Sequence, residues 1–138
     1  MALQDTLKTI TAWNVPPVSA TTSLKTAIDL MSEHGVCALA VATDGEILGL
    51  VTDLDLSSAV VRGWDPRTTM VAECMTACDL ITGSGARNPC VQLDEDETVE
   101  NALKLLDGQG VHNLLVSGPG SSLVGIVSSC SLLKAAIA

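Results

Sequence analysis

The chain has 138 residues and a formal net charge of −9, and it contains no Phe or Tyr and only two Trp residues, Trp13 and Trp64. This length is enough for one compact domain, whose core must be built from Leu, Val, Ile, Ala and Met. The seven basic residues are scattered. We therefore exclude nucleic acid as a partner, because its binding requires clustered Lys and Arg.

The same negative charge disfavours an anionic membrane surface. No apolar run approaches the roughly 18 residues that span a bilayer, so we expect no membrane partner. The N-terminal residues lack a basic region followed by an apolar block, which is the pattern of a secretory signal. These observations together predict a cytoplasmic location.

The number and spacing of the five cysteines argue against a disulfide framework and against a metal site. They are Cys37, Cys74, Cys78, Cys90 and Cys130. The C-x₃-C pair Cys74 and Cys78 has no second pair to complete a tetrahedral zinc site. We expect no bound metal or other cofactor, and the sequence does not decide the redox state of the cysteines.

The sequence pattern of the first half of the chain predicts a strand, a helix, a β-hairpin and a second helix. The first helix has apolar residues at helical spacing: Leu24, Ala27, Ile28 and Met31. Ser23 is placed as its N-cap, and Gly35 follows its last periodic residue. Turn residues 43–45 separate two short apolar runs, which indicates a hairpin, and a second helix begins near Asp53.

The connection that follows is less regular. Residues 70–76 (MVAECMT) are compatible with a short helix. Residues 78–89 are rich in Gly, Ser and Asn and are predicted as a loop.

The second half repeats the first. Its helix has the same apolar spacing: Val99, Ala102, Leu103 and Leu106. Thr98 stands at the N-cap and Gly110 at the end. Two apolar runs parted by residues 118–121 predict a second hairpin, and a last helix begins near Ser129.

The two halves align residue by residue. Residues 23–41 match residues 98–116, and the run Gly-Leu-Val-Thr at 49–52 matches Gly-Ile-Val-Ser at 125–128. Internal repetition of this kind indicates one supersecondary unit used twice. We predict an α/β fold of two tandem βαββα repeats, packed as a pseudo-two-fold pair in a single domain over 1–138. Repeat one covers about 10–64 and repeat two about 78–138.

This arrangement resembles the CBS domain pair, also called a Bateman module, over essentially the whole chain. The similarity lies in the duplicated runs, their order and spacing, and in AECMT, which is similar to the short methionine-bearing helix that precedes a repeat in that family. The resemblance implies a regulatory module that binds an adenosine-containing ligand, such as AMP, ADP, ATP or S-adenosylmethionine, in a cleft between the repeats.

In the family a recurring pattern, Gly–apolar–x–Thr/Ser–x–x–Asp, contributes to each cleft. The first repeat has it intact as Gly49, Leu50, Thr52 and Asp55. The resemblance implies that Thr52 faces phosphate at a helix N-terminus and that Asp55 accepts hydrogen bonds from the ribose hydroxyls. The alternative from the residues alone is that Asp53 and Asp55 only favour the helix dipole.

The second repeat departs from this pattern. Ile126 and Ser128 match, but Ser131 stands where the carboxylate should be. We therefore expect a weaker second cleft.

The resemblance also implies an apolar adenine pocket lined from both repeats. The matching residues are Cys37 and Leu50 from the first half, and Ala86, Val91, Val111 and His112 from the second. His112 has the alternative of a surface residue at a strand end. Arg87 is a candidate phosphate partner because its guanidinium offers paired donors, or it is a solvated loop charge.

We predict that the chain is not an enzyme, because it lacks a P-loop, a dinucleotide-binding glycine motif and a nucleophile elbow. Its response must then be delivered to an effector protein that the sequence does not identify. Two alternatives are a non-sensing interaction module and a thiol-based redox regulator that uses Cys74 and Cys78.

A homodimer is predicted through apolar stripes on the second helix of each repeat. The stripes comprise Leu56, Ala59 and Val60 in one helix and Leu132, Leu133, Ala136 and Ile137 in the other. The alternative is that both stripes pack against their own sheets.

Overall fold

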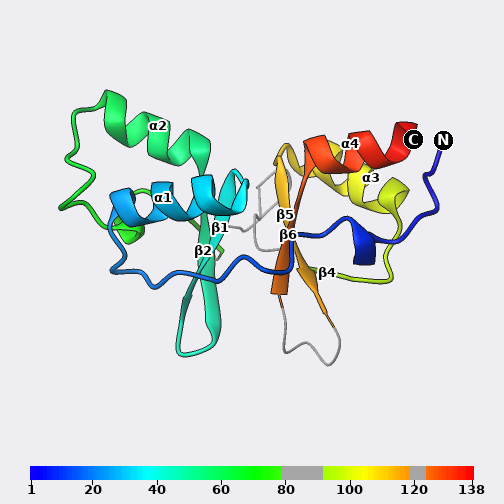
Figure 1. The fold of residues 1–138 in the computed structure, drawn as a ribbon, viewed down its shortest axis with the longest axis horizontal. Coiled ribbons are helices and arrows are strands. Elements are labelled where there is room, and N and C mark those ends of the chain that lie inside the picture. Colours follow the sequence, from blue (N-terminus) through cyan, green and yellow to red (C-terminus); the bar gives the residue numbers. More distant parts are fainter. Residues whose placement is uncertain (79–91, 119–123) are drawn as a thin grey trace. The chain divides into compact units, whose positions relative to one another are not determined.

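The computed structural model describes residues 1–78, 92–118 and 124–138 (Figure 1). The chain divides into two compact units. The repeat-one unit is Val15–Asp79, and the repeat-two unit combines Met1–Asn14 with Leu80–Ala138.

The repeat-one unit is a three-stranded antiparallel sheet, in the order β1-β2-β3, with helices α1 and α2. Its elements are α1 (Leu24–His34), β1 (Ala38–Thr43), β2 (Glu46–Thr52), α2 (Asp53–Val61), the 3₁₀ turn η2 (Val71–Glu73) and β3 (Thr76–Ala77). Strand β2 therefore lies in the middle of the sheet and leads directly into α2.

Local signals in the sequence explain where these elements begin and end. The Ser23 side chain accepts a hydrogen bond from the Thr26 N–H and caps α1. Gly35 ends α1 in the left-handed conformation, with φ 65°. Asp44 and Gly45 both have positive φ and turn the β1–β2 hairpin, as the Asp-Gly pair predicts.

The repeat-two unit has the same helix–hairpin–helix arrangement. Its elements are the 3₁₀ turn η1 (Leu7–Thr9), β4 (Gln92–Asp94), α3 (Val99–Gln109), β5 (Asn113–Ser117), β6 (Val124–Ser128) and α4 (Ser129–Ile137). Strand β4 pairs parallel with β5, and β5 pairs antiparallel with β6. Thr98 caps α3, and Gly110 ends it with φ 65°. The α/β class and the duplicated unit are thus confirmed.

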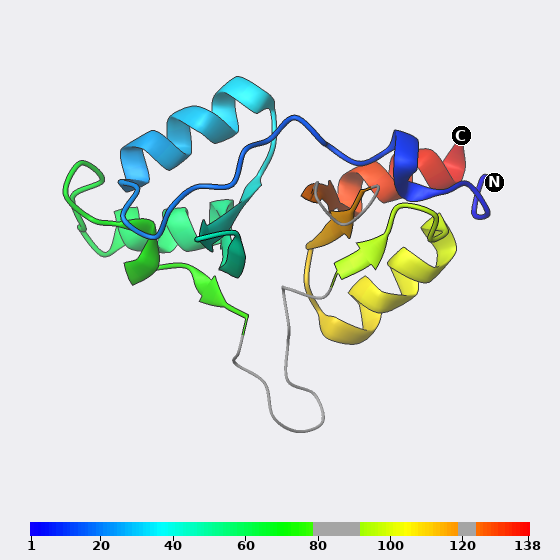
Figure 2. The ribbon, with the colours of Figure 1, turned by 90° about the horizontal axis from the view of Figure 1, so that it is seen from below.

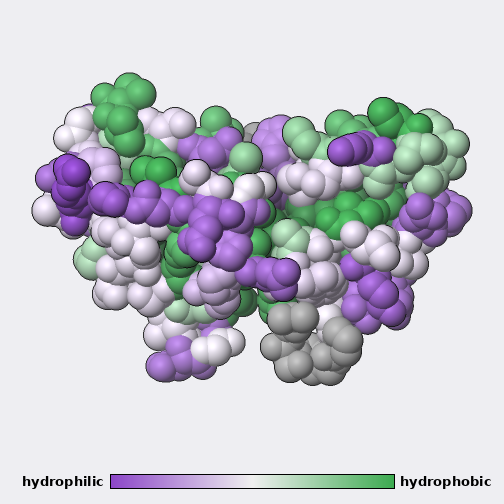
Figure 3. All heavy atoms as spheres, in the orientation of Figure 1, coloured by the Kyte–Doolittle hydropathy of each residue, from purple (hydrophilic) through white to green (hydrophobic). Residues whose placement is uncertain are grey.

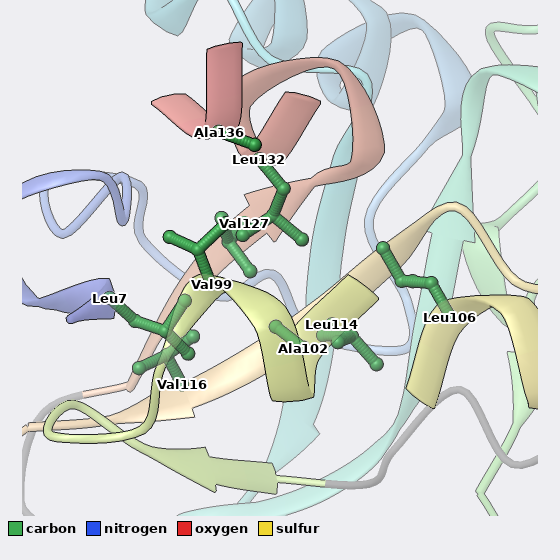
Figure 4. Packing of buried hydrophobic residues seen from close by; sticks show 9 residues of the cluster. All are labelled: Leu7, Val99, Ala102, Leu106, Leu114, Val116, Val127, Leu132 and Ala136. Atoms are coloured by element: carbon green, nitrogen blue, oxygen red, sulfur yellow. The ribbon is translucent and has the colours of Figure 1, made fainter. Parts of the chain in front are cut away.

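The core of the repeat-two unit is aliphatic (Figure 4). Its buried members come from η1, both helices and both hairpin strands: Leu7, Val99, Ala102, Leu106, Leu114, Val116, Val127, Leu132 and Ala136. Branched aliphatic side chains of this kind pack the helices closely on the sheet.

Two predicted elements differ. Residues 70–76, predicted as a short helix, form the 3₁₀ turn η2 and the start of β3. The first strand expected in repeat one is reduced to an isolated bridge between Val18 and Val41, whereas β4 in repeat two is a strand. Pro16 and Pro17 precede Val18 and have no backbone N–H to donate to a ladder. The pairing is therefore limited to the bonds that Val18 makes with Ala40 and Ala42.

Each unit includes the segment that precedes the other repeat (Figure 2). Residues 1–14, which come before repeat one in the sequence, pack in the repeat-two unit, and Ala12 pairs with Ile126 of β6. Residues 65–78, which come before repeat two, pack in the repeat-one unit, where β3 pairs with β2. The sequence does not predict this exchange of segments. Because of it, the side chains of β3 lie beside the end of β2, where α2 begins.

No helix in the described ranges is both long enough and apolar enough to cross a membrane.

Candidate functional site

The junction of β2 and α2 forms a reciprocal capping box. The Asp55 N–H donates to Thr52 Oγ1 at 3.3 Å, and the Thr52 N–H donates to Asp55 Oδ2 at 3.0 Å. Both side chains are half-buried. Two of the N–H groups that a helix start leaves unpaired are thereby satisfied, which stabilises α2 by about 1 kcal/mol per cap.

Asp55 also has a partner outside the junction. The Thr76 hydroxyl in β3 donates to Asp55 Oδ1 at 3.4 Å. Burial raises the pKa of the Asp55 carboxyl above its ordinary value, although the hydrogen bonds from Thr52 and Thr76 act in the opposite direction. The neighbouring Asp53 carboxylate adds to the rise.

The glycine of the motif has a steric role. A Cβ at Gly49 would collide with the carbonyl oxygen of Thr76 and lie 3.1 Å from the Ala77 Cα. Only glycine lets β3 approach β2 closely at this point. Gly49 therefore allows Thr76 to reach Asp55.

The junction of β6 and α4 has the same backbone but weaker chemistry. Ser128 caps α4 by accepting from the Ser131 N–H at 3.2 Å, and the Ser128 hydroxyl bonds to the Ser131 hydroxyl at 3.1 Å. Ser131 is exposed and carries no charge, so it offers one hydroxyl where Asp55 offers two carboxylate oxygens.

Cys37 and His112 occupy equivalent positions in their units. The Cys37 carbonyl accepts from the Asp53 N–H at 2.9 Å, and the His112 carbonyl accepts from the Ser129 N–H at 2.8 Å. Each residue thus joins the start of the second helix to the start of its hairpin, and both side chains are exposed.

The remaining predicted residues divide by location. Leu50 and Ile126 are buried at the centres of β2 and β6, and Val111 is half-buried just before β5. Ala86, Arg87 and Val91 lie outside the described residues. The structure brings Thr52 and Asp55 together in one junction and Ser128 and Ser131 together in the other. The adenine pocket that combines residues of both repeats stays a prediction.

The redox alternative used Cys74 and Cys78 as exposed thiols. In the structure Cys78 is disulfide-bonded and Cys74 is a half-buried free cysteine. Burial raises the pKa of the Cys74 thiol, and the carboxylates of Asp55 and Glu73 add to this effect. A raised pKa reduces the thiolate that redox chemistry requires. Within the described ranges, no three His, Cys, Asp or Glu side chains cluster as metal ligands.

The sequence matches a known family of domains. The CBS domain model matches this chain twice, over residues 7–62 and 79–138. The chain belongs to the CBS domain family. The two matches correspond to the two repeats, so the chain is a tandem CBS pair.

Two curated relatives are longer than this chain. An uncharacterized protein of Methanopyrus kandleri, MK0525, is 26% identical over 115 residues, which cover 80% of this chain and 53% of the relative. A homoserine O-acetyltransferase of Methanosphaerula palustris is 29% identical over 121 residues, which cover 87% of this chain and 22% of the enzyme. The chain therefore spans about half the length of one relative and less than a quarter of the other.

Solved CBS pairs share the fold. An uncharacterized conserved protein from Pyrococcus horikoshii has a TM-score of 0.74 at 21% identity, over 99% of this chain and 95% of that one. CBSX2, solved in complex with AMP, has a TM-score of 0.65 at 23% identity, over 96% of both chains. The CBS pair of MJ0100, solved with 5′-methylthioadenosine and S-adenosylmethionine, has a TM-score of 0.68 at 20% identity, over 94% and 98%.

Sequence reasoning missed Thr76. It is the last residue of AECMT, which the sequence predicts as part of a short helix and not as part of the site. The turn that begins at Val71 corresponds in the structure to the turn that begins at Leu7. Residues 7–12 and 71–76 share no identical residue at equivalent positions, so the sequence carries no internal match that reveals this correspondence.

Proposed function

We propose that this chain is a regulatory module that binds an adenosine-containing ligand at the Thr52–Asp55 junction. The observation that carries the proposal is the half-buried Asp55 carboxylate at a helix N-terminus, each oxygen of which accepts one hydrogen bond from the described residues. A carboxylate has about four acceptor positions. One position is therefore left on each oxygen, which suits the two adjacent hydroxyls of ribose.

The start of α2 favours the rest of such a ligand. Helix N-termini attract phosphate through their unpaired N–H groups and dipole. The alternative role of Asp55, as a helix cap, is compatible with ligand binding because capping uses only Oδ2. The complexes of CBSX2 with AMP and of MJ0100 with adenosyl compounds support the choice of ligand class.

The second junction is proposed to bind weakly. The hydroxyls of Ser128 and Ser131 already bond to each other, and neither carries a charge. Hydrogen bonds to charged groups contribute about twice as much as those between neutral groups. We therefore expect one strong site per chain.

Isothermal titration calorimetry of the purified protein with AMP, ADP, ATP and S-adenosylmethionine tests the proposal. We expect saturable binding of at least one of the four compounds, AMP being the first probe, at close to one equivalent per chain. Guanosine monophosphate is the control for the base. Absence of binding by all four compounds would contradict the proposal.

We further propose that the module is not itself a catalyst and that its ligand state is read by an effector protein. The proposal rests on membership of the CBS domain family together with the regulatory role that the sequence resemblance implies. A pull-down with and without the bound nucleotide, from an extract of the source organism, tests it. The expected result is a partner whose recovery depends on the nucleotide.

A homodimer is proposed through exposed apolar residues of α2 and α4, over which Figure 3 shows hydrophobic surface. The exposed residues are Leu54, Val60, Val61, Leu133 and Ile137. Four residues of the predicted stripes are instead buried, which agrees with the alternative that the stripes pack within the chain: Leu56, Ala59, Leu132 and Ala136. A groove of about 440 Å³ also opens beside Val61, which is 85% exposed.

Light scattering at micromolar concentration tests the dimer. We expect the mass of two 14.2 kDa chains. Val61→Ser should shift the protein toward the monomer because it removes apolar area from the contact. A wild-type mass of one chain, with and without nucleotide, would contradict the dimer.

A further inference from the structure

The carboxylate of Asp55 contacts a part of the chain that lies outside its own repeat motif. Thr76 belongs to β3, in the segment that connects the two repeats. Strand β3 places Thr76 opposite Leu50 of β2, two residues before Thr52. From there its hydroxyl donates to Asp55 Oδ1.

The other unit has the same backbone at this point. Leu7 and Val71 begin equivalent turns: the Thr11 N–H donates to the Leu7 carbonyl at 3.0 Å, and the Met75 N–H donates to the Val71 carbonyl at 2.8 Å. The next residues, Ala12 and Thr76, then pair with the central strands β6 and β2. Ala12 is therefore the structural counterpart of Thr76.

The side chains at these two pairs of equivalent positions differ between the units, and the two differences go together. In the repeat-one unit a hydroxyl at position 76 meets a carboxylate at position 55. In the repeat-two unit the two counterparts are Ala12, which has no hydroxyl, and Ser131, which has no carboxylate. The donor thus occurs only in the unit that has an acceptor for it.

We propose that Thr76 is a positioning residue that orients the Asp55 carboxylate to bind a vicinal diol, such as the ribose of a nucleotide. The inference rests on the proposed function. The Thr52 N–H holds Oδ2 and the Thr76 hydroxyl holds Oδ1, so the plane of the carboxylate is set from both sides. With respect to the described part of the chain, each oxygen keeps one acceptor position for one hydroxyl of the diol.

The contribution of Thr76 is expected to be modest. Its bond to Oδ1 is 3.4 Å, which is long for a bond between two oxygens. Loss of a single hydrogen bond of this kind corresponds to roughly a two- to tenfold change in affinity. A calorimetric comparison of variants resolves a change of that size.

The experiment compares AMP with 2′,3′-dideoxy-AMP in the wild type, Thr76→Val and Thr76→Ser. The readout is the ratio of the affinity for AMP to the affinity for 2′,3′-dideoxy-AMP, which measures the preference for the diol. A general loss of structure would lower both affinities and would not lower this ratio selectively. Thr43→Val, an exposed substitution at the end of β1, is the control. Circular dichroism establishes that each variant is folded.

We expect the wild type to prefer AMP, Thr76→Val to lose about two- to tenfold of that preference, and Thr76→Ser to retain it. Equal affinity of the wild type for both compounds would contradict the diol role of Asp55 and with it the proposed function. A preference for AMP that survives unchanged in Thr76→Val would overturn only the role of Thr76.

A ligand-free readout accompanies the titrations. Removal of the Thr76 donor should raise the pKa of the Asp55 carboxyl, followed by NMR, in Thr76→Val but not in Thr76→Ser. An unchanged pKa in Thr76→Val would also overturn the role of Thr76, whether or not AMP binds.

Discussion

Substitution of Gly49 tests whether β3 packs on β2 as described. A Cβ at this position would overlap the carbonyl oxygen of Thr76 and lie 3.1 Å from the Ala77 Cα. Both atoms belong to the backbone, so the contact cannot be relieved by a change of side-chain rotamer. Either β3 moves away from β2 or the strain is retained.

We expect Gly49→Ala to destabilise the protein by about 1–3 kcal/mol, the usual cost of forcing an extra carbon into a packed site. For a chain of this size that corresponds to a fall in melting temperature of roughly 3–12 °C. The amide of Cys78 should exchange faster with solvent, because its N–H donates to the Leu48 carbonyl at 2.9 Å only while β3 is docked.

Gly108→Ala is the matched control. Gly108 lies within α3, and a Cβ there meets no atom within 4 Å. The same chemical change should therefore stabilise the protein by about 0.5–1 kcal/mol, the difference in helix propensity between Ala and Gly. Chemical denaturation and amide exchange measure both variants. A Gly49→Ala protein with wild-type stability and unchanged exchange at Cys78 would refute the packing of β3.

Two further predictions concern titrating groups. The pKa of the Asp55 carboxyl is raised in the folded state, so the folded protein is more stable with Asp55 protonated than with Asp55 ionised. This stability is lost as the pH rises through the raised pKa. Asp55→Asn should therefore be more stable relative to wild type at pH 7 than at pH 3, and a pH-independent difference in unfolding free energy would contradict this. Cys74, half-buried and with a raised pKa, should react with iodoacetamide more slowly than the exposed Cys37 and Cys130. Mass spectrometry of labelled peptides measures the rates, and an equal rate at Cys74 would contradict its placement.

The secondary structure was largely predictable because its signals are local. Ser23 and Thr98 each cap a helix through a bond to a residue three positions later, and Gly35 ends a helix through its own left-handed conformation. The capping residue Thr52 and the acid Asp55 lie within one turn of each other. A sequence pattern is sufficient where the interacting residues are neighbours in the chain.

The exchange of segments between the units was not predictable in this way. Nothing local in residues 1–14 indicates whether they pack with the repeat that follows or with the other one. Thr76 reaches Asp55 over 21 positions, and the contact depends on Gly49 admitting β3. The packing of the units into a single domain stays a prediction.

The apolar stripes illustrate a second limit. Val60 and Ala59 are adjacent in the sequence and both are apolar, yet Val60 is 50% exposed and Ala59 is 2% exposed. A helix of nine residues that is rich in apolar side chains has no clear polar face, so periodicity does not separate core from surface.

The affinity of an adenosine nucleotide for Asp55→Asn, compared with Asp53→Asn, tests the central claim most directly. Both substitutions remove one negative charge from the first turn of α2, and Asp53 is exposed, with its Oδ1 accepting the adjacent Leu54 N–H. If Asp55 binds the ribose, calorimetry should show about a 10- to 100-fold loss in Asp55→Asn, or roughly 1.5–3 kcal/mol, and less than about a twofold change in Asp53→Asn. Equal affinities in the two variants would show that Asp55 serves only the helix terminus.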